Sequence, residues 1–155
     1  MAYDSRLGLI SFFNGETGDY LYTISPTNIK LNTYNVTWES QDYSAYRDAN
    51  GKLHRNPLAS RPPKVEFQVR NGMDNEELNE FMAEIRACAF NEHTRKQRLY
   101  HAKVYIPEID DYVEDDVYMV DPTFSIYRID GEVIYYNSFR MAFIGYGNNT
   151  SWSNK

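Results

Sequence analysis

The fold is indicated first by the stretch Tyr46-Arg47-Asp48-Ala49-Asn50-Gly51-Lys52-Leu53-His54-Arg55. Asn50-Gly51 is a strong hairpin signal, because both residues tolerate positive φ and match the twist of flanking strands. The pattern predicts strands at 43–47 and 52–56, with a polar loop tip between them. Such a β-ribbon carries its charged side chains outward, which is typical of a contact surface.

Alternating segments on either side of this hairpin predict further strands. After Pro62-Pro63, the residues Val65, Phe67 and Val69 alternate with polar neighbours, as in a strand with one buried face. Residues 9–13 and 20–24 flank a Gly-rich loop and predict an opening hairpin. Residues 30–38 alternate loosely and predict a strand that ends near Glu39.

One helix is predicted, at residues 75–91. Asp74 followed by Glu77 resembles a capping box, in which a side-chain oxygen meets the first free amide groups of the helix. Apolar residues then recur at spacings of three and four, as on one face of a helix. This stripe comprises Leu78, Phe81, Met82, Ile85 and Cys88 or Ala89.

The rest of the chain again predicts β-structure, with strands at 99–106, 112–120, 123–129 and 132–144. Asp130-Gly131 is the second hairpin signal. Short hairpin connections favour antiparallel pairing. We therefore expect an α+β, mainly antiparallel single domain over residues 1–146, with a helix packed on a curved sheet, a β-sandwich or a barrel. Residues 147–155, rich in Asn and Ser, predict a flexible tail.

The composition narrows the possible partners. The chain of 155 residues has 42% hydrophobic and 15% aromatic residues, with a formal net charge of -6. This charge argues against specific nucleic acid binding, which depends on clustered Lys and Arg. We expect a soluble protein made in the cytoplasm, because no stretch is long and apolar enough for a membrane span and no secretory signal is recognisable. The single Cys88 excludes an intrachain disulfide and is expected in the core.

No motif for catalysis, a cofactor or a metal is recognisable. His54, His93 and His101 lack the spacing of a zinc site and are expected to be exposed. An acidic run near residue 110 contains enough carboxylates for a hard cation, but it lacks the calcium-loop pattern, so a solvated turn is the better interpretation. We therefore assign no catalytic, cofactor-binding or metal-binding residues and expect no enzyme.

The basic hairpin is the main candidate site. Charge asymmetry in an acidic chain often marks complementary assembly contacts, although an exposed loop kept soluble by its charge explains the pattern equally well. The candidate intersubunit residues are Arg47, Asn50, Gly51, Lys52, His54, Arg55 and Arg61. The candidate acidic patch that receives them comprises Asp110, Asp111, Glu114, Asp115 and Asp116, with Glu108 beside it.

Aromatic residues offer a second candidate surface. Tyrosine and tryptophan rings stack on sugars or line protein interfaces, although alternating tyrosines on strands are more often ordinary half-buried packing. A carbohydrate-binding module that recognises a host wall glycan is therefore the alternative function. The rings concerned are Tyr34, Trp38, Tyr43, Tyr46, Tyr135, Tyr136 and Tyr146.

Taken together, the hairpin at 43–55, the segment Lys64-Val65-Glu66-Phe67, the single helix, a strand that ends at Pro107 and the late segment 138–144 resemble a protein family. The family comprises small tail proteins of phages and prophages of Gram-positive bacteria, and the resemblance covers about residues 33–146. The order of elements is similar to the tail-tube fold of tube, distal-tail and baseplate hub proteins.

The resemblance implies a structural subunit of a phage tail, in a tube-like or baseplate ring. Its partners would be copies of itself, in a hexamer or another cyclic oligomer, and other tail proteins. Its location would be the virion tail, after assembly in the host cytoplasm. In such rings the sheets line the lumen and the helix lies outside, so the acidic patch would either receive the hairpin or face the lumen and repel DNA.

Overall fold

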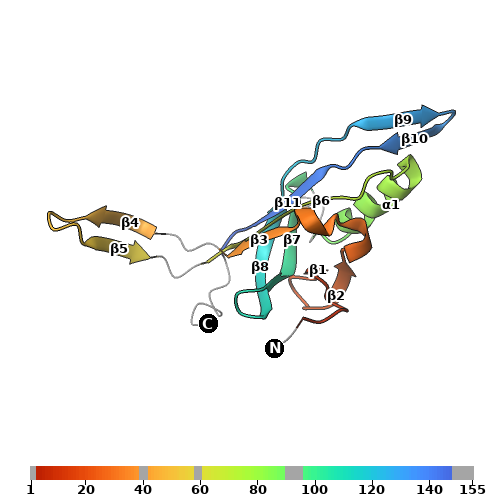
Figure 1. The fold of residues 1–155 in the computed structure, drawn as a ribbon. Helices are drawn as coiled ribbons and strands as arrows, with labels where there is room; N and C mark the ends of the chain where they lie inside the picture. The colour runs from red at the N-terminus through yellow and green to blue at the C-terminus, as the bar shows by residue number, and fades with distance from the viewer. Residues whose placement is uncertain (1–2, 39–41, 58–60, 90–95, 148–155) are drawn as a thin grey trace.

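The computed structural model describes residues 3–38, 42–57, 61–89 and 96–147, and shows a β-rich body with two projecting ribbons (Figure 1). Seven strands form the main sheet, all paired antiparallel in the order β2-β1-β7-β8-β11-β6-β3. Their bounds are β1 Ile10–Phe13, β2 Tyr20–Thr23, β3 Asn35–Trp38, β6 Pro63–Gln68, β7 Leu99–Ile106, β8 Asp111–Met119 and β11 Arg140–Gly145. The mainly antiparallel α+β class predicted from the sequence is confirmed.

The projecting ribbons are separate two-stranded sheets. One pairs β4 (Asp42–Arg47) with β5 (Leu53–Pro57), and the other pairs β9 (Ile126–Asp130) with β10 (Val133–Tyr136). The main sheet has two ends, β2 and β3, so the pairings of the described residues do not close a barrel.

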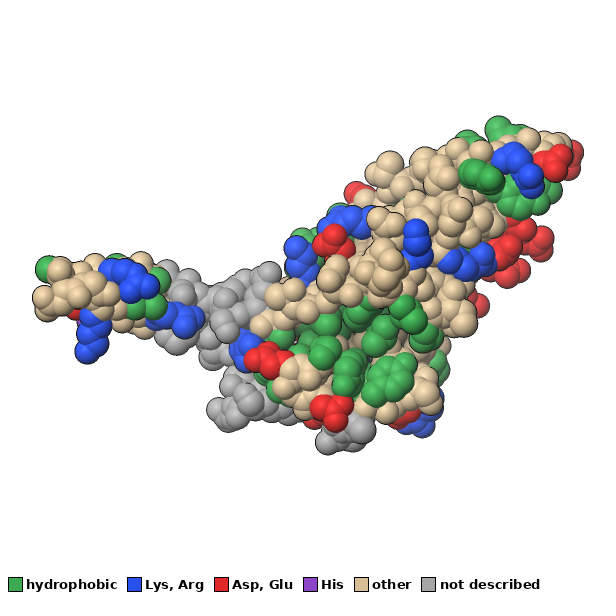
Figure 2. All heavy atoms as spheres, in the orientation of Figure 1, with side chains coloured by type: hydrophobic (Ala, Val, Ile, Leu, Met, Phe, Trp, Pro, Cys, Tyr) green, Lys and Arg blue, Asp and Glu red, His purple; other side chains and the backbone are tan. Residues whose placement is uncertain are grey.

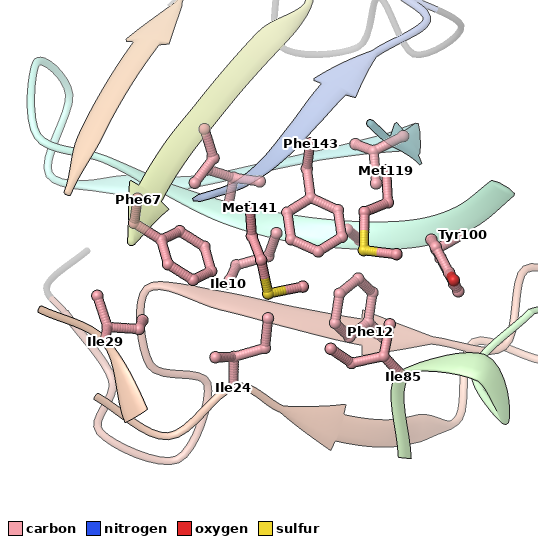
Figure 3. Close-up of a cluster of buried hydrophobic side chains, with 14 of the residues drawn as sticks. Ile10, Phe12, Ile24, Ile29, Phe67, Ile85, Tyr100, Met119, Met141 and Phe143 are labelled. Carbon is pink, nitrogen blue, oxygen red and sulfur yellow. The ribbon is translucent and has the colours of Figure 1, made fainter. Parts of the chain in front are cut away.

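The core lies on one face of the main sheet. Strand β7 buries Tyr100, Ala102, Val104 and Ile106 on this face, because alternate side chains of a strand point the same way. Figure 3 shows aromatic, Met and Ile side chains meeting there from several strands and from the helix. The ring of Phe12 on β1 lies 5.4 Å from that of Tyr100 and 5.5 Å from that of Phe143 on β11.

The helix α1 (Asn75–Arg86) covers part of this face with the predicted stripe Leu78, Phe81, Met82 and Ile85, all buried. Asp74 caps it as predicted, since its Oδ1 accepts the Glu77 amide at 2.8 Å. The helix ends at Arg86, five residues before the predicted end, and residues 90–91 lie outside the described ranges.

Two predicted strands are broken in the structure. Residues 30–38 form a short 3-10 helix η2 (Leu31–Thr33) before β3, held by the Thr33 hydroxyl, which donates to the Lys30 carbonyl at 2.5 Å. Residues 132–144 divide into β10 and β11, which belong to different sheets. A second 3-10 helix, η1 (Pro26–Asn28), occupies the turn predicted after β2.

The two hairpin signals form turns of a different kind from the expected one. Gly51 and Gly131 have positive φ, at 80° and 64°, whereas neither Asn50 nor Asp130 does. The β9–β10 turn is therefore Gly131-Glu132, with positive φ at its first central residue, and the β4–β5 turn is a longer loop.

The single domain over residues 1–146 remains a prediction. The C-terminal tail also remains one, because residues 148–155 lie outside the described ranges. His93 also lies outside them. Within the described residues, no helix has the length and apolar character needed to cross a membrane.

Candidate functional site

The β4–β5 ribbon, which we call the arm, projects from the body at the end opposite α1 (Figure 1). Its two strands hydrogen-bond with each other and with no other strand of the described chain. Figure 2 shows Lys and Arg side chains along it. A two-stranded hairpin alone is at best marginally stable in water, so local contacts must hold its shape.

Asp48 organises the tip of the arm. Its Oδ1 accepts the amides of Asn50 and Lys52, each at 3.0 Å, and its carbonyl accepts the Gly51 amide at 2.9 Å. Its Oδ2 lies 2.9 Å from Nε2 of His54. The hydrogen bond with His54, followed by that with the Lys52 amide, lowers the pKa of the Asp48 carboxyl below its usual value. The carboxylate thus stays ionised and fixes the turn.

Most of the candidate contact residues on the arm hold it together. The Tyr46 ring stacks on the His54 ring, with centroids 4.8 Å apart and planes at 11°. Arg47 Nη1 donates to the Gly51 carbonyl at 3.0 Å. Lys52 is exposed at the tip, and Leu53 beside it is 45% exposed. The arm therefore presents Lys52 from a preorganised turn, at a low cost in entropy on binding.

Arg61 lies at the base of the arm and belongs to the body. Its guanidinium carbon is 3.7 Å from the centre of the Trp38 ring, and its Nη2 donates to the Trp38 carbonyl at 3.1 Å. The same Nη2 lies 3.5 Å from Glu108 Oε2 in the β7–β8 turn. Arg61 is thus engaged with residues of its own chain, unlike the exposed cation that the sequence suggested.

The predicted acidic patch divides between the two faces of β8. Glu114 Oε1 and Asp116 Oδ1 lie 2.6 and 2.9 Å from the two ring nitrogens of His101 on β7. Burial alone would lower the pKa of His101, but the hydrogen bonds that the protonated ring donates to Asp116 and Glu114 outweigh it, so the pKa is raised. His101 is half-buried between two carboxylates, so the expectation of an exposed histidine is wrong.

Asp115 points to the opposite face and is 1% exposed. Its Oδ1 accepts the Asp116 amide and its Oδ2 accepts the Gly147 amide, both at 2.8 Å. Of the remaining members, Asp110 accepts the Tyr105 hydroxyl at 2.5 Å and Asp111 accepts the Tyr112 amide at 2.8 Å. The predicted patch is therefore not one open acidic surface.

The aromatic rings that the structure describes lie in several separate places. Tyr34 packs against the core beside Phe67, and Arg61 covers Trp38. Tyr46 is on the arm, and the exposed Tyr146 lies against Tyr118. Tyr135 faces Arg128 on the other ribbon and Tyr136 contacts Phe124, while nothing is described of the Tyr43 side chain.

Cys88 is buried, as predicted. It is 2% exposed and its Sγ donates to the Glu84 carbonyl at 3.2 Å. Burial, and then the charge of Glu84, raise the pKa of its thiol to about 12. With its thiol buried and the pKa of that thiol raised, Cys88 is a side chain of the core.

A family model with the description "Family of unknown function (DUF6711)" matches residues 11–146. The chain belongs to this family. No sequence among the curated proteins matches it. The match begins within β1 and ends just after β11, so the family spans the whole main sheet, the arm and the β9–β10 ribbon.

Among the solved structures that are similar to this DUF6711 chain, two come from gene transfer agent particles. One is described as the tail of an empty GTA particle, computed with helical refinement in C6 symmetry. It has a TM-score of 0.53 and 11% identity, covering 94% of this chain and 96% of the other. The second is the virion of a native gene transfer agent (GTA) particle, with a TM-score of 0.49, 10% identity and coverage of 94% and 95%. At 11% identity, the likeness to the first structure is one of fold alone.

Proposed function

We propose that the chain is a non-enzymatic structural subunit of a phage-like tail, which assembles into a ring through its arm. The observation that carries the proposal is the projecting, preorganised arm on a chain of which 94% matches the fold of a protein from the tail of a GTA particle. An isolated ribbon with exposed Lys52, Leu53 and Tyr46 buries little on its own chain. A neighbouring subunit supplies the surface that the arm lacks.

The arm is compatible with a closed ring and with a two-fold dimer. Its contact with a different surface of the next copy closes into a ring or continues as a helix if it runs head-to-tail, whereas reciprocal exchange of arms between two copies gives a dimer. The C6 symmetry of the GTA tail supports a hexamer as the ring. The virion tail would be the location and other tail proteins would be the further partners.

Sedimentation velocity of the full chain tests this proposal. A variant in which a short Gly-Ser linker replaces residues 44–56 removes the arm and retains Arg61, which covers Trp38. We expect the parent chain to form a discrete oligomer at high concentration and the armless variant to remain monomeric. The main sheet should persist in the variant, because no strand of this sheet pairs with β4 or β5 in the described residues.

Thermal unfolding of both proteins provides the control. Similar midpoints of thermal unfolding for the parent chain and the armless variant show that the loss of assembly does not come from misfolding. An armless variant that assembles like the parent would contradict the role of the arm, and a parent that stays monomeric at all concentrations would contradict the proposed function.

A further inference from the structure

A groove beside α1 is lined by acidic side chains, whereas those of the predicted patch do not form one open surface. Its volume is about 250 Å³, and it lies between α1, β2, η1 and the segment that follows β6. Tyr22 of β2 and Phe81 of α1 line its apolar part. Glu77, Glu80 and Glu84 follow one side of the helix along the groove, since residues three and four apart share a helix face.

Two of these carboxylates have no partner within the described chain. Arg70 pairs with Glu77 and also donates from Nε to Asn28 Oδ1 at 3.1 Å, so this pair is satisfied. Glu80 and Glu84 are exposed and make no ion pair or side-chain hydrogen bond with the described residues. They leave a local negative charge beside the half-buried ring of Tyr22, which favours a long cationic side chain whose methylene stem packs on that ring.

Lys52 on the arm has the matching properties. It is exposed at a turn that Asp48 fixes, and its ammonium group has no partner in the described residues. The arm and α1 lie at opposite ends of the molecule, with basic side chains on the arm and acidic ones near α1 (Figures 1 and 2). Copies arranged head-to-tail therefore bring the arm of one toward α1 of the next.

We propose that the groove beside α1 receives the arm of a second copy, with Lys52 placed between Glu80 and Glu84. The inference rests on the proposed function and specifies its contact. The groove takes the place of the acidic residues 110–116 as the acceptor of the arm. Glu114 and Asp116 are paired with His101, Asp110 accepts a hydrogen bond from Tyr105, and Asp115 is buried.

A disulfide trap tests this contact directly. The double variant Lys52→Cys/Glu80→Cys carries one new thiol on the arm and one in the groove, while the native Cys88 is buried. Mild oxidation should give a covalent ladder of dimers, trimers and higher species on a non-reducing gel. An equal mixture of the two single variants should give covalent dimers and stop there, since each copy carries one new thiol. The matched control Lys52→Cys/Glu16→Cys places the second thiol on the exposed β1–β2 loop and should give at least about tenfold less product.

The outcomes separate the inference from the proposed function. A double variant that assembles but gives no more ladder than the Glu16 control overturns the groove contact and leaves the ring subunit intact. A chain that is monomeric by sedimentation and gives no ladder overturns both.

Charge reversal provides a second measurement that does not depend on disulfide geometry. Glu80→Lys should weaken association by roughly tenfold, since it turns an attraction into a repulsion, and Lys52→Glu in the same chain should restore part of it. Glu16→Lys changes the net charge equally and should leave association near the parent value. Equal effects of Glu80→Lys and Glu16→Lys would overturn the contact.

Discussion

At the scale of single residues, His101 links two neighbouring strands through charge. Its ring lies between Glu114 and Asp116, on the face of β7 and β8 that points away from the core. Its pKa is raised in the folded protein, so the protonated ring binds the carboxylates better than the neutral ring does. This contribution is complete below the pKa of an unfolded histidine and is lost as pH rises through the folded value.

We therefore expect the free energy of unfolding to fall as pH rises from the ordinary pKa of histidine, about 6.5, through the raised pKa of His101. The His101→Gln variant should show a smaller change over the same range. Denaturant unfolding of both proteins at several pH values measures the difference. If the two proteins depend equally on pH, the stabilisation does not come from His101.

Gly145 has no space for a side chain. A Cβ at this position would lie 2.6 Å from Pro63 Cδ and 2.8 Å from Asp115 Oδ2. Gly145→Ala is expected to lower the free energy of unfolding by about 1–3 kcal/mol, as overpacking in a core does. Denaturant unfolding measures it, and an unchanged stability would show that Pro63 and the buried Asp115 move apart without cost.

The same region shows what the sequence cannot reveal about single residues. Glu114-Asp115-Asp116 reads as three equivalent acids, but alternation along β8 buries the middle one. The apolar residues Val113, Val117 and Met119 mark the buried face of β8. Because Asp115 lies on the same alternating set, its carboxylate points inward. Its partner Gly147 follows β11, three strands further along the chain, and no local pattern indicates this contact.

At the scale of elements, the structures predicted from the sequence are those that a local pattern of residues specifies, whether or not their pairing is local. The arm, the helix start and β7 follow directly from turn residues, a cap and strict alternation. The break between β10 and β11 was missed, because Asn137-Ser138 lies in a long strand-like run and the change of sheet depends on tertiary pairing. The groove beside α1 was missed because its residues come from two parts of the chain that are distant in sequence, 22–28 and 70–84.

The cap of α1 gives a prediction for an element. Asp74→Ala removes the acceptor of the Glu77 amide and should cost about 1 kcal/mol of stability, whereas Asp74→Asn should keep most of it. Thermal or denaturant unfolding of the two variants makes the comparison. Equal losses in both would show that the negative charge at the helix start, and not the hydrogen bond, stabilises this end.

At the scale of the whole molecule, the distribution of charge predicts that the proposed assembly depends on salt. The chain is acidic overall, yet the arm is basic and lies far from the carboxylates of α1. Screening shortens the reach of such charges to about 8 Å at physiological ionic strength and to about 3 Å at 1 M. Association of the full chain should therefore weaken between about 0.05 and 0.5 M NaCl, as measured by sedimentation, and association that strengthens with salt would indicate an apolar contact instead.

If copies of this chain join head-to-tail through the arm, they form a ring. Electron microscopy of the full chain at high concentration shows whether such rings exist. We predict closed rings or stacked rings with a central channel and one subunit per symmetry step, six in the case of the proposed hexamer, and no such particles from the armless variant. A uniform population of single, unassembled molecules from the full chain would contradict the claim.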